Sequence, residues 1–321
     1  MTALLAHMKR LWPRYTFAPA LPFFLWPLYL IVRGEARWET FAVMILGCVL
    51  PYVSFTTKRL FQAVAPIGWV GVLYDSMRFF KNVGITPERV HICDLRAIEM
   101  GLFGVTMNGQ RTTLHDWLQA HSHPALDLFA AVPYGTFIGA AFLFSIYLYR
   151  IDFDAMRRFT TAFFFMNVLG FLTYHLYPAA PPWYFHQHGC VADLMARASE
   201  GPNLARVDQM LGFSYFGGFY GRSNDVFGAV PSLHVAYPLL IVLEGYRHFG
   251  RFLRVASILF FLSMCFAAVY LDHHWVVDVL VGIAYATGVF LAMRAVWARL
   301  SPSAPGDAAD RSRVAFTAAR S

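Results

Sequence analysis

The sequence predicts an all-α polytopic membrane protein: a transmembrane helix bundle of six core helices, with about eight spans in total. Of its 321 residues, 58% are hydrophobic and only 14% are charged, whereas an average soluble domain has about 25% charged residues. Apolar stretches long enough to cross a hydrocarbon layer of about 30 Å recur along the chain. The net charge of +7 does not indicate a nucleic-acid partner, because the basic residues lie between these stretches instead of gathering on one segment.

Eight segments have the length and composition of spans. They are 17–33, 40–56, 60–80, 125–149, 159–177, 231–247, 254–271 and 275–298. The third is the weakest, because Gln62, Asp75 and Arg78 interrupt it. The first is expected to be a retained anchor and not a signal peptide, because it contains three prolines and no clear small-residue cleavage site follows it.

The basic residues predict the orientation in the membrane. They precede the first span, follow the second and the last, and fill the turns after 149 and 247. With eight spans all these sites lie on one face, which the positive-inside rule makes cytoplasmic. The long segments 81–124 and 178–228 then lie on the periplasmic or lumenal face, and only Arg33 and Arg37 disagree with this topology.

Three regions follow from this division. Residues 1–124 hold the N-terminal spans and an outer interfacial segment, 125–300 form the membrane core, and 301–321 are expected to be a disordered cytoplasmic tail. Cys48 and Cys265 fall in spans. The sequence favours free thiols also at Cys93 and Cys190, although these two lie in outer segments where an oxidising space would allow them to pair.

The most informative stretches are GAVPSLHVAYP at 228–238 and YLDHHWVVDVLVG at 270–282. Pro231 suits the first turn of a helix that begins at the outer surface, which places His234 near that end. This helix and the next are each about 26 Å long at about 1.5 Å per residue, close to the membrane thickness. The hairpin should therefore return His274 to the level of His234.

His274 and Asp278 are four residues apart and are expected on one helix face. An ionised residue inside a span costs about 2.5–3.5 kcal/mol, so Asp278 needs a partner, and His274 is the nearest candidate. A carboxylate on one imidazole nitrogen leaves the other free to attack an electrophile. We therefore expect His274 to be a nucleophile, Asp278 to orient it and His234 to act as general acid and base. The amides around Ser232, at a helix N-terminus, suit an anion such as phosphate.

Other polar residues near this site are expected to have structural and not catalytic roles. Asp272 is expected to cap the last helix, and His273 should face about 100° away from His274, towards headgroups or the loop. A zinc site in HQHGC at 186–190 lacks a second ligand pair of familiar spacing. The sequence therefore assigns no metal and no cofactor.

At these residues the sequence resembles the type 2 phosphatidic acid phosphatase superfamily, whose motifs centre on Pro-Ser-Gly-His and His-x3-Asp. Leu233 stands where those phosphatases have Gly. The resemblance implies that His274 forms a phosphohistidine, that Asp278 orients it and that His234 is the acid and base. These roles agree with those inferred from the residues alone.

Departures from the phosphatase pattern narrow the resemblance. Gly170 and Tyr177 stand where the phosphatases have Lys and Arg of their first motif, and Ala267 and Ala268 replace a Ser-Arg pair. The stretches PSLH, HHWVVD and YPAAPPWY resemble instead the inositol phosphorylceramide synthase branch and its bacterial relatives. A phosphate monoester carries a charge of about −1.5 to −2, whereas a lipid diester carries one negative charge. The missing cations therefore favour a diester donor.

The expected function is the transfer of a phosphoryl headgroup, such as inositol phosphate, from a glycerophospholipid to a lipid alcohol such as ceramide. Membrane lipids are thus the expected partners, and Ser232, Arg222 and Arg78 are the candidates for gripping phosphate. One alternative is a lipid phosphate or polyprenyl pyrophosphate phosphatase, in which water replaces the alcohol. The non-enzymatic alternative is a transporter or scaffold that uses the intramembrane His and Asp as a proton relay.

Overall fold

The computed structural model describes residues 2–81, 83–196, 202–220 and 225–300. Within these ranges all regular secondary structure is helical apart from one short hairpin, which confirms the predicted all-α helix bundle. The tail 301–321, expected to be disordered, lies outside the described residues.

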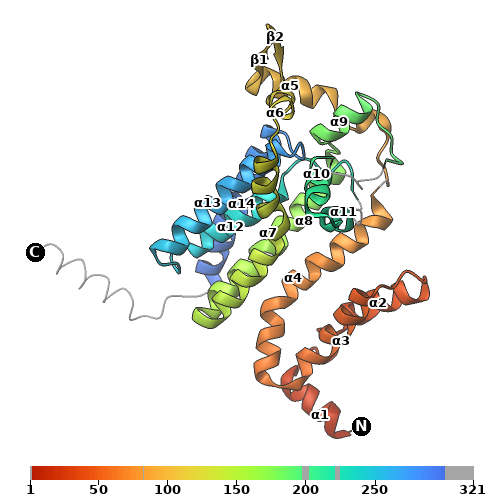
Figure 1. Cartoon of the computed structure of the whole chain (residues 1–321). Coiled ribbons are helices and arrows are strands. Elements are labelled where there is room, and N and C mark those ends of the chain that lie inside the picture. Colours follow the sequence, from red (N-terminus) through yellow and green to blue (C-terminus); the bar gives the residue numbers. More distant parts are fainter. Residues whose placement is uncertain (1, 82, 197–201, 221–224, 301–321) are drawn as a thin grey trace, which may run out of the picture.

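Five helices form the core of the bundle. These are α7 (Pro124–Ile151), α8 (Phe153–Leu176), α12 (Leu233–Gly245), α13 (Arg251–Tyr270) and α14 (Val276–Leu300). Helix α12 packs against the other four and is buried along most of its length (Figure 1). The main hydrophobic cluster, centred on side chains such as Phe163, Tyr237 and Met264, fills the space around it. The His234 motif therefore lies at the start of the central helix.

The N-terminal helices lie beside this core. They are α1 (Thr2–Leu11), α2 (Leu21–Val32), α3 (Trp38–Val53) and α4 (Phe55–Phe80). Ser54 ends α3 and begins α4, where its hydroxyl accepts from the Thr57 amide in a capping box. Helix α4 runs along α8, and α2 and α3 pack on the other side of it (Figure 1).

All eight expected spans fold as helices. Four of them, α7, α8, α13 and α14, are long and apolar enough to cross a membrane, while α2, α3 and α12 are shorter apolar helices. Helix α4 is 26 residues long but is not among those four. The polar residues noted in this segment, Gln62, Asp75 and Arg78, lie within it.

The two long polar segments fold into short elements at one end of the bundle. The first contains η1 (Pro87–Arg89), α5 (Cys93–Phe103), β1 (Val105–Met107), β2 (Gln110–Thr112) and α6 (Leu114–Ala120). Strands β1 and β2 pair antiparallel, with Val105 opposite Thr112, around Asn108 and Gly109, which both have positive φ. The second contains α9 (Pro182–His188), α10 (Pro202–Leu211) and α11 (Tyr215–Tyr220). In Figure 1, α5, α6, the hairpin and α9 lie together at the top.

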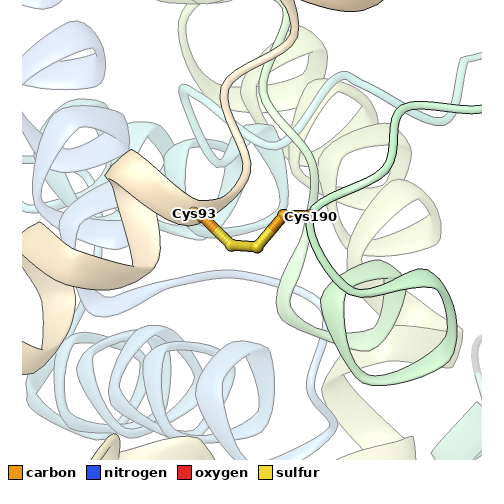
Figure 2. The surroundings of a disulfide bond; sticks show 2 residues. All are labelled: Cys93 and Cys190. Carbon is orange, nitrogen blue, oxygen red and sulfur yellow. A yellow bond between two sulfur atoms is a disulfide. The ribbon is translucent and has the colours of Figure 1, made fainter.

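Backbone pairing and a disulfide tie these segments to each other. Ala179 forms isolated β-bridges to His91 and to Gly228, so the backbone segments that precede α5, α9 and α12 lie side by side. Cys93, at the start of α5, is bonded to Cys190, just after α9, with their Cα atoms 5.5 Å apart (Figure 2). The expectation of free thiols at these two positions was wrong, because the fold brings the two outer segments into contact. Cys48 and Cys265 are free.

Candidate active site

The two histidine motifs meet where α12 and α14 begin. Helix α12 starts at Leu233 behind the N-cap Ser232, so Pro231 precedes the helix and does not occupy its first turn as expected. Helix α14 starts at Val276, so His274 lies in the preceding loop and not on one helix face with Asp278. The His274 amide donates to the carbonyl of Ala268 at 3.0 Å, which turns the loop back over the end of α13. The predicted meeting of His234 and His274 is nevertheless correct.

The imidazoles of these two residues are in direct contact. His234 Nδ1 lies 2.9 Å from His274 Nε2, and His274 Nδ1 lies 3.0 Å from the carbonyl oxygen of Ala229. A carbonyl only accepts, so Nδ1 of His274 carries the proton and Nε2 carries the lone pair. His234 then donates through Nδ1, and its Nε2 accepts from the hydroxyl of Tyr220 at 3.2 Å. The chain Tyr220–His234–His274–Ala229 therefore satisfies every ring nitrogen with both rings neutral.

Asp278 supports this arrangement across a longer distance than expected. Its Oδ2 lies 3.6 Å from His274 Nδ1 and accepts a hydrogen bond from the Trp275 amide at 2.8 Å. Both Asp278 and His274 are buried. The Ala229 carbonyl, which sequence reasoning missed, therefore fixes the tautomer of His274, while Asp278 supplies a negative charge that stabilises positive charge on the ring. A backbone carbonyl in a loop has no sequence signal by which it could have been found.

Aromatic rings enclose the histidines. Tyr134 of α7 stacks on His234 with ring centroids 4.7 Å apart, and Phe137 lies 4.8 Å from the same ring. His273 is buried between Tyr134 and Tyr220, at 5.1 and 5.4 Å. Burial, together with the neighbouring His274, lowers the pKa of His273 to about 3, so this ring is neutral. His273 therefore contacts the outer segment 178–228 through Tyr220, as one of the two expected alternatives had it, and its buried ring does not face headgroups.

A cavity of about 600 Å³ opens at the histidine pair. His234, His273 and His274 line it, and it extends between α4, α7 and α8 towards α2 and α3. Most of its wall is hydrophobic, with side chains such as Ile67, Val70, Ile138, Phe142 and Leu233. Such a wall suits a lipid chain next to the reacting groups.

Four charged residues also line this cavity: Arg37, Glu39, Asp75 and Asp225. Asp225 lies seven residues before Ser232, and its Oδ1 accepts from the Phe227 amide at 3.0 Å. Burial raises the pKa of Asp225 to about 6. Sequence analysis did not select Asp225, and its only signal was an acidic side chain close before the histidine motif.

Two of the three expected phosphate ligands, Ser232 and Arg78, do not line the cavity. The Ser232 side chain is completely buried, does not line the cavity and has no hydrogen-bond partner within the described ranges. Its amide, expected to bind an anion, instead donates to the Asp278 carbonyl at 3.0 Å. Arg78 also does not line the cavity; its guanidinium pairs with Asp75 at 3.2 Å and Glu35 at 3.8 Å. Arg222 lies outside the described residues.

Asp272 and the HQHGC segment have a shared structural role. Asp272 precedes α14 by four residues and contacts His186 and His115, so its assignment as the helix cap was wrong. His186 is held between Asp272 and Asp116. In the part of the chain that the structure describes, no three His, Cys, Asp or Glu side chains are arranged to hold a metal ion.

Comparison with known proteins gives a consistent set of matches. A family model described as the PAP2 superfamily matches residues 108–292. The chain is 33% identical over 254 residues to the phosphoinositol dihydroceramide synthase of Bacteroides thetaiotaomicron, covering 78% of this chain and 82% of that protein. It is 30% identical over 265 residues to the inositol phosphorylceramide synthase catalytic subunit of Schizosaccharomyces pombe, covering 82% of this chain and 60% of the relative.

The corresponding catalytic subunit of Saccharomyces cerevisiae is 27% identical over 283 residues, which cover 87% of this chain and 66% of the relative. The chain thus spans about four-fifths of the bacterial relative and about two-thirds or less of these two yeast relatives. No solved structure matches the chain.

Proposed function

Because the chain belongs to the PAP2 superfamily, we propose that it is an integral membrane phosphotransferase that moves inositol phosphate from a glycerophospholipid to a ceramide-type lipid alcohol. The observation that carries the proposal is the histidine pair, in which Nε2 of His274 holds a lone pair next to a proton donor, at the end of a hydrophobic cavity. The named activities of the bacterial and yeast relatives support the choice of substrates.

In the first step the donor phosphorus takes the place of the hydrogen bond between the two rings. A bond forms between His274 Nε2 and phosphorus, and the bond from phosphorus to the glycerol oxygen breaks. For this step His234 carries a second proton on Nε2, favoured by the negative charge of the bound phosphodiester and donated to the Tyr220 hydroxyl. It gives its Nδ1 proton to the leaving oxygen, so that diacylglycerol and the His234 ring are both left neutral. The phosphorylated His274 ring is positively charged, and the Ala229 carbonyl and Asp278 carboxylate lie on its Nδ1 side, where they stabilise that charge.

In the second step the acceptor hydroxyl replaces diacylglycerol. His234, now without its Nδ1 proton, takes the proton of this hydroxyl while the oxygen attacks phosphorus. The bond between phosphorus and His274 Nε2 breaks, and both rings return to their starting state. During both steps His234 Nε2 keeps its proton and donates it to the Tyr220 hydroxyl, so Nδ1 is the atom that gives and then takes the transferred proton.

The cation positions of the phosphatases are occupied by packing contacts here. A side chain added at Gly170 would meet Leu233 Cδ2 at 2.9 Å, and Ala267 and Ala268 are fully buried. Tyr177 stacks on His91. Arg37 is the only Lys or Arg among the described residues that line the cavity. This low density of positive charge supports a singly charged diester as donor over a monoester.

Asp225 supports a polyhydroxylated headgroup. A carboxylate accepts hydrogen bonds from neighbouring hydroxyl groups, and this one lies in the cavity wall with its Oδ1 already oriented by the Phe227 amide. We assign Asp225 to hydroxyl recognition on the headgroup. The phosphate-binding roles of Ser232, Arg222 and Arg78 stay predictions.

The test uses purified protein in vesicles that contain phosphatidylinositol, with or without ceramide. We expect equal amounts of diacylglycerol and inositol phosphorylceramide, formed only when ceramide is present. Release of inositol phosphate at the same rate without ceramide would identify a phosphatase instead. Phosphatidic acid, a monoester, should be consumed much more slowly than phosphatidylinositol, and Asp225→Asn should raise KM for the inositol lipid.

A further inference from the structure

A row of six side chains, which we call the charge chain, joins the outer segments to the catalytic loop. It runs from the buried interior to the surface, and acidic and basic side chains alternate along it. Two members are on α5, two on α6, one on α9 and one in the loop between α13 and α14. In order they are Glu99, His115, Asp272, His186, Asp116 and Arg96.

The inner half of the charge chain is centred on His115, which is fully buried. Its Nε2 lies 3.7 Å from Glu99 Oε1 and its Nδ1 lies 3.5 Å from Asp272 Oδ1. Each ring nitrogen thus faces a carboxylate, which accepts hydrogen bonds and does not donate when ionised. Burial lowers the pKa of His115, but the two carboxylates outweigh burial and raise it overall. The two facing carboxylates therefore favour the protonated form of the ring.

The outer half repeats this arrangement around His186. Its Nδ1 lies 2.6 Å from Asp272 Oδ2 and its Nε2 lies 2.9 Å from Asp116 Oδ1. Arg96 Nη2 contacts the other oxygen of Asp116 at 3.2 Å. Three basic side chains therefore alternate with three carboxylates. Burying charges costs desolvation energy, so such a chain is better suited to fixing geometry than to raising stability.

Two members of this row, Asp272 and Glu99, belong to or contact the backbone on either side of the nucleophile. Asp272 is two residues before His274. Glu99 accepts hydrogen bonds from the amides of Val276 and Val277, at 3.1 and 3.3 Å, and so caps the first turn of α14 directly after the loop. His115 also packs edge-on against Trp275, with centroids 5.1 Å apart. The loop that carries His274 is therefore held at both ends by residues of the outer segments.

We propose that Glu99, His115 and His186 are positioning residues for the transfer reaction, which hold the catalytic loop 271–277 so that His274 stays aligned with His234. This assignment rests on the proposed function for its kinetic part only. We call the charge chain together with the loop 271–277 that it holds the clamp. Glu99 and Arg96 precede the region that the family model matches, so the clamp includes residues from outside that region. The Cys93–Cys190 disulfide fastens α5 to the segment after α9 and so closes the clamp covalently.

Two variants test the clamp from opposite ends. Glu99→Gln removes the buried charge, and His186→Gln removes a cation at the partly exposed end, where loss of a charge disturbs folding less. For both we expect kcat to fall by about tenfold to a hundredfold, since a misplacement on the order of 1 Å can cost about 10²-fold. KM for both lipids should change less than twofold. The matched controls are Glu88→Gln on η1 and His188→Gln on α9, which make the same chemical changes at residues that are not members of the charge chain.

Hydrogen exchange of the 271–277 backbone gives a readout that needs no turnover. Exchange in this segment should be faster in Glu99→Gln and His186→Gln than in wild type, and unchanged in the two controls. Unchanged exchange and unchanged kcat in both variants would overturn the clamp. If wild-type protein transfers no inositol phosphate but the variants still loosen the loop, the proposed function fails and the clamp stands.

A charge rescue separates positioning from general structure. His186 faces Asp116 of α6 and Asp272 of the loop, and Arg96 of α5 pairs with the same Asp116. His186→Arg keeps a cation between the two carboxylates at every accessible pH. It should recover at least half of the wild-type kcat. It should also keep that rate above pH 9, where we expect kcat of the wild type to decline because His186 loses its proton. An Arg variant as slow as His186→Gln would contradict a role that depends on charge.

Discussion

Gly282 of α14 lies directly against the backbone of Ser232, so closely that a Cβ at position 282 would be 2.4 Å from the Ser232 carbonyl oxygen. The Ser232 amide donates to the Asp278 carbonyl one turn earlier on α14. The helices that carry His234 and Asp278 therefore touch backbone to backbone beside the reacting rings. Close packing at this point sets the distance between the acid–base group and the nucleophile.

Gly282→Ala should separate α12 from α14, because a methyl group that meets a backbone oxygen cannot be relieved by side-chain rotation. Overpacking of this kind costs about 1–3 kcal/mol in stability, and activity should fall further because His234 moves away from His274. Thermal unfolding in detergent and the transfer rate measure the two effects. Gly288→Ala is the matched control, since a Cβ there meets nothing within 4 Å. Wild-type activity in Gly282→Ala would contradict the packing argument.

Each imidazole of the pair is expected to be essential for a different reason. His274→Ala removes the nucleophile and should abolish transfer, while His234→Ala removes proton transfer, worth about 10²–10⁴ in rate. Asp278→Asn should retain some activity, because it spares both rings and the Ala229 contact that fixes the tautomer. Rates of inositol phosphorylceramide formation provide the measurement, with His121→Ala as an exposed control. Full activity in either active-site histidine variant would refute the site.

The sequence was sufficient for the helix bundle and for the histidine pair, because both depend on regular spacing. Apolar segments of span length marked the eight helices expected to be spans, and the hairpin of α12 and α13 returned His274 to His234, although α12 has 13 residues and α13 has 20. The orientation of the His274 ring could not be predicted from spacing. The group that holds its Nδ1 is the carbonyl of Ala229, which any residue would supply, and only the path of the loop brings it there.

Long-range pairing explains the remaining errors. Asp272 has the residue type of a helix cap, but its partners His115 and His186 come from α6 and α9, far away in sequence. Tyr220 is one of 16 tyrosines, and nothing local distinguishes it from the others. Local rules therefore misassign residues whose roles depend on how the outer segments fold over the bundle.

The charge on His186 predicts a pH dependence of stability. Burial lowers the pKa of His186, but Asp116 and Asp272 raise it overall from 6.5 to about 9. The folded protein therefore keeps a proton that the unfolded chain releases above about pH 6.5. The stabilisation is fully present below that pH and is lost as pH rises towards 9. The melting temperature should fall over this interval, and the fall should be smaller in His186→Gln than in His188→Gln. Equal slopes in these two variants would argue against the assignment.

The orientation of the active site is testable with single cysteines. The basic turn before α13 should be cytoplasmic by the positive-inside rule, so the opposite end, with the β1–β2 hairpin, should be periplasmic or lumenal. In a variant with Cys48 and Cys265 replaced by Ala, Gln110→Cys should react with an impermeant maleimide from the outer side only. Arg251→Cys should react from the cytoplasmic side only. Labelling of Gln110→Cys from the cytoplasmic side alone would reverse the proposed topology.

The two-step mechanism makes a stereochemical prediction. If His274 takes the phosphoryl headgroup and the acceptor hydroxyl then displaces it, phosphorus undergoes two in-line substitutions. Each substitution inverts its configuration, so the net result is retention. If His274 acted only as a base, the acceptor would attack the donor lipid directly, and the configuration would invert once.

The geometry of His274 favours retention. Its Nδ1 proton is committed to the Ala229 carbonyl at 3.0 Å, and its Nε2 lone pair faces the cavity beside His234 Nδ1. A second base next to His234 would be redundant, whereas a nucleophile next to a proton donor completes a displacement. We therefore expect a phosphatidylinositol analogue with a chiral phosphorothioate to give inositol phosphorylceramide of retained configuration. Inversion would eliminate the phosphohistidine and reduce His274 to a general base, although transfer of the headgroup itself would remain.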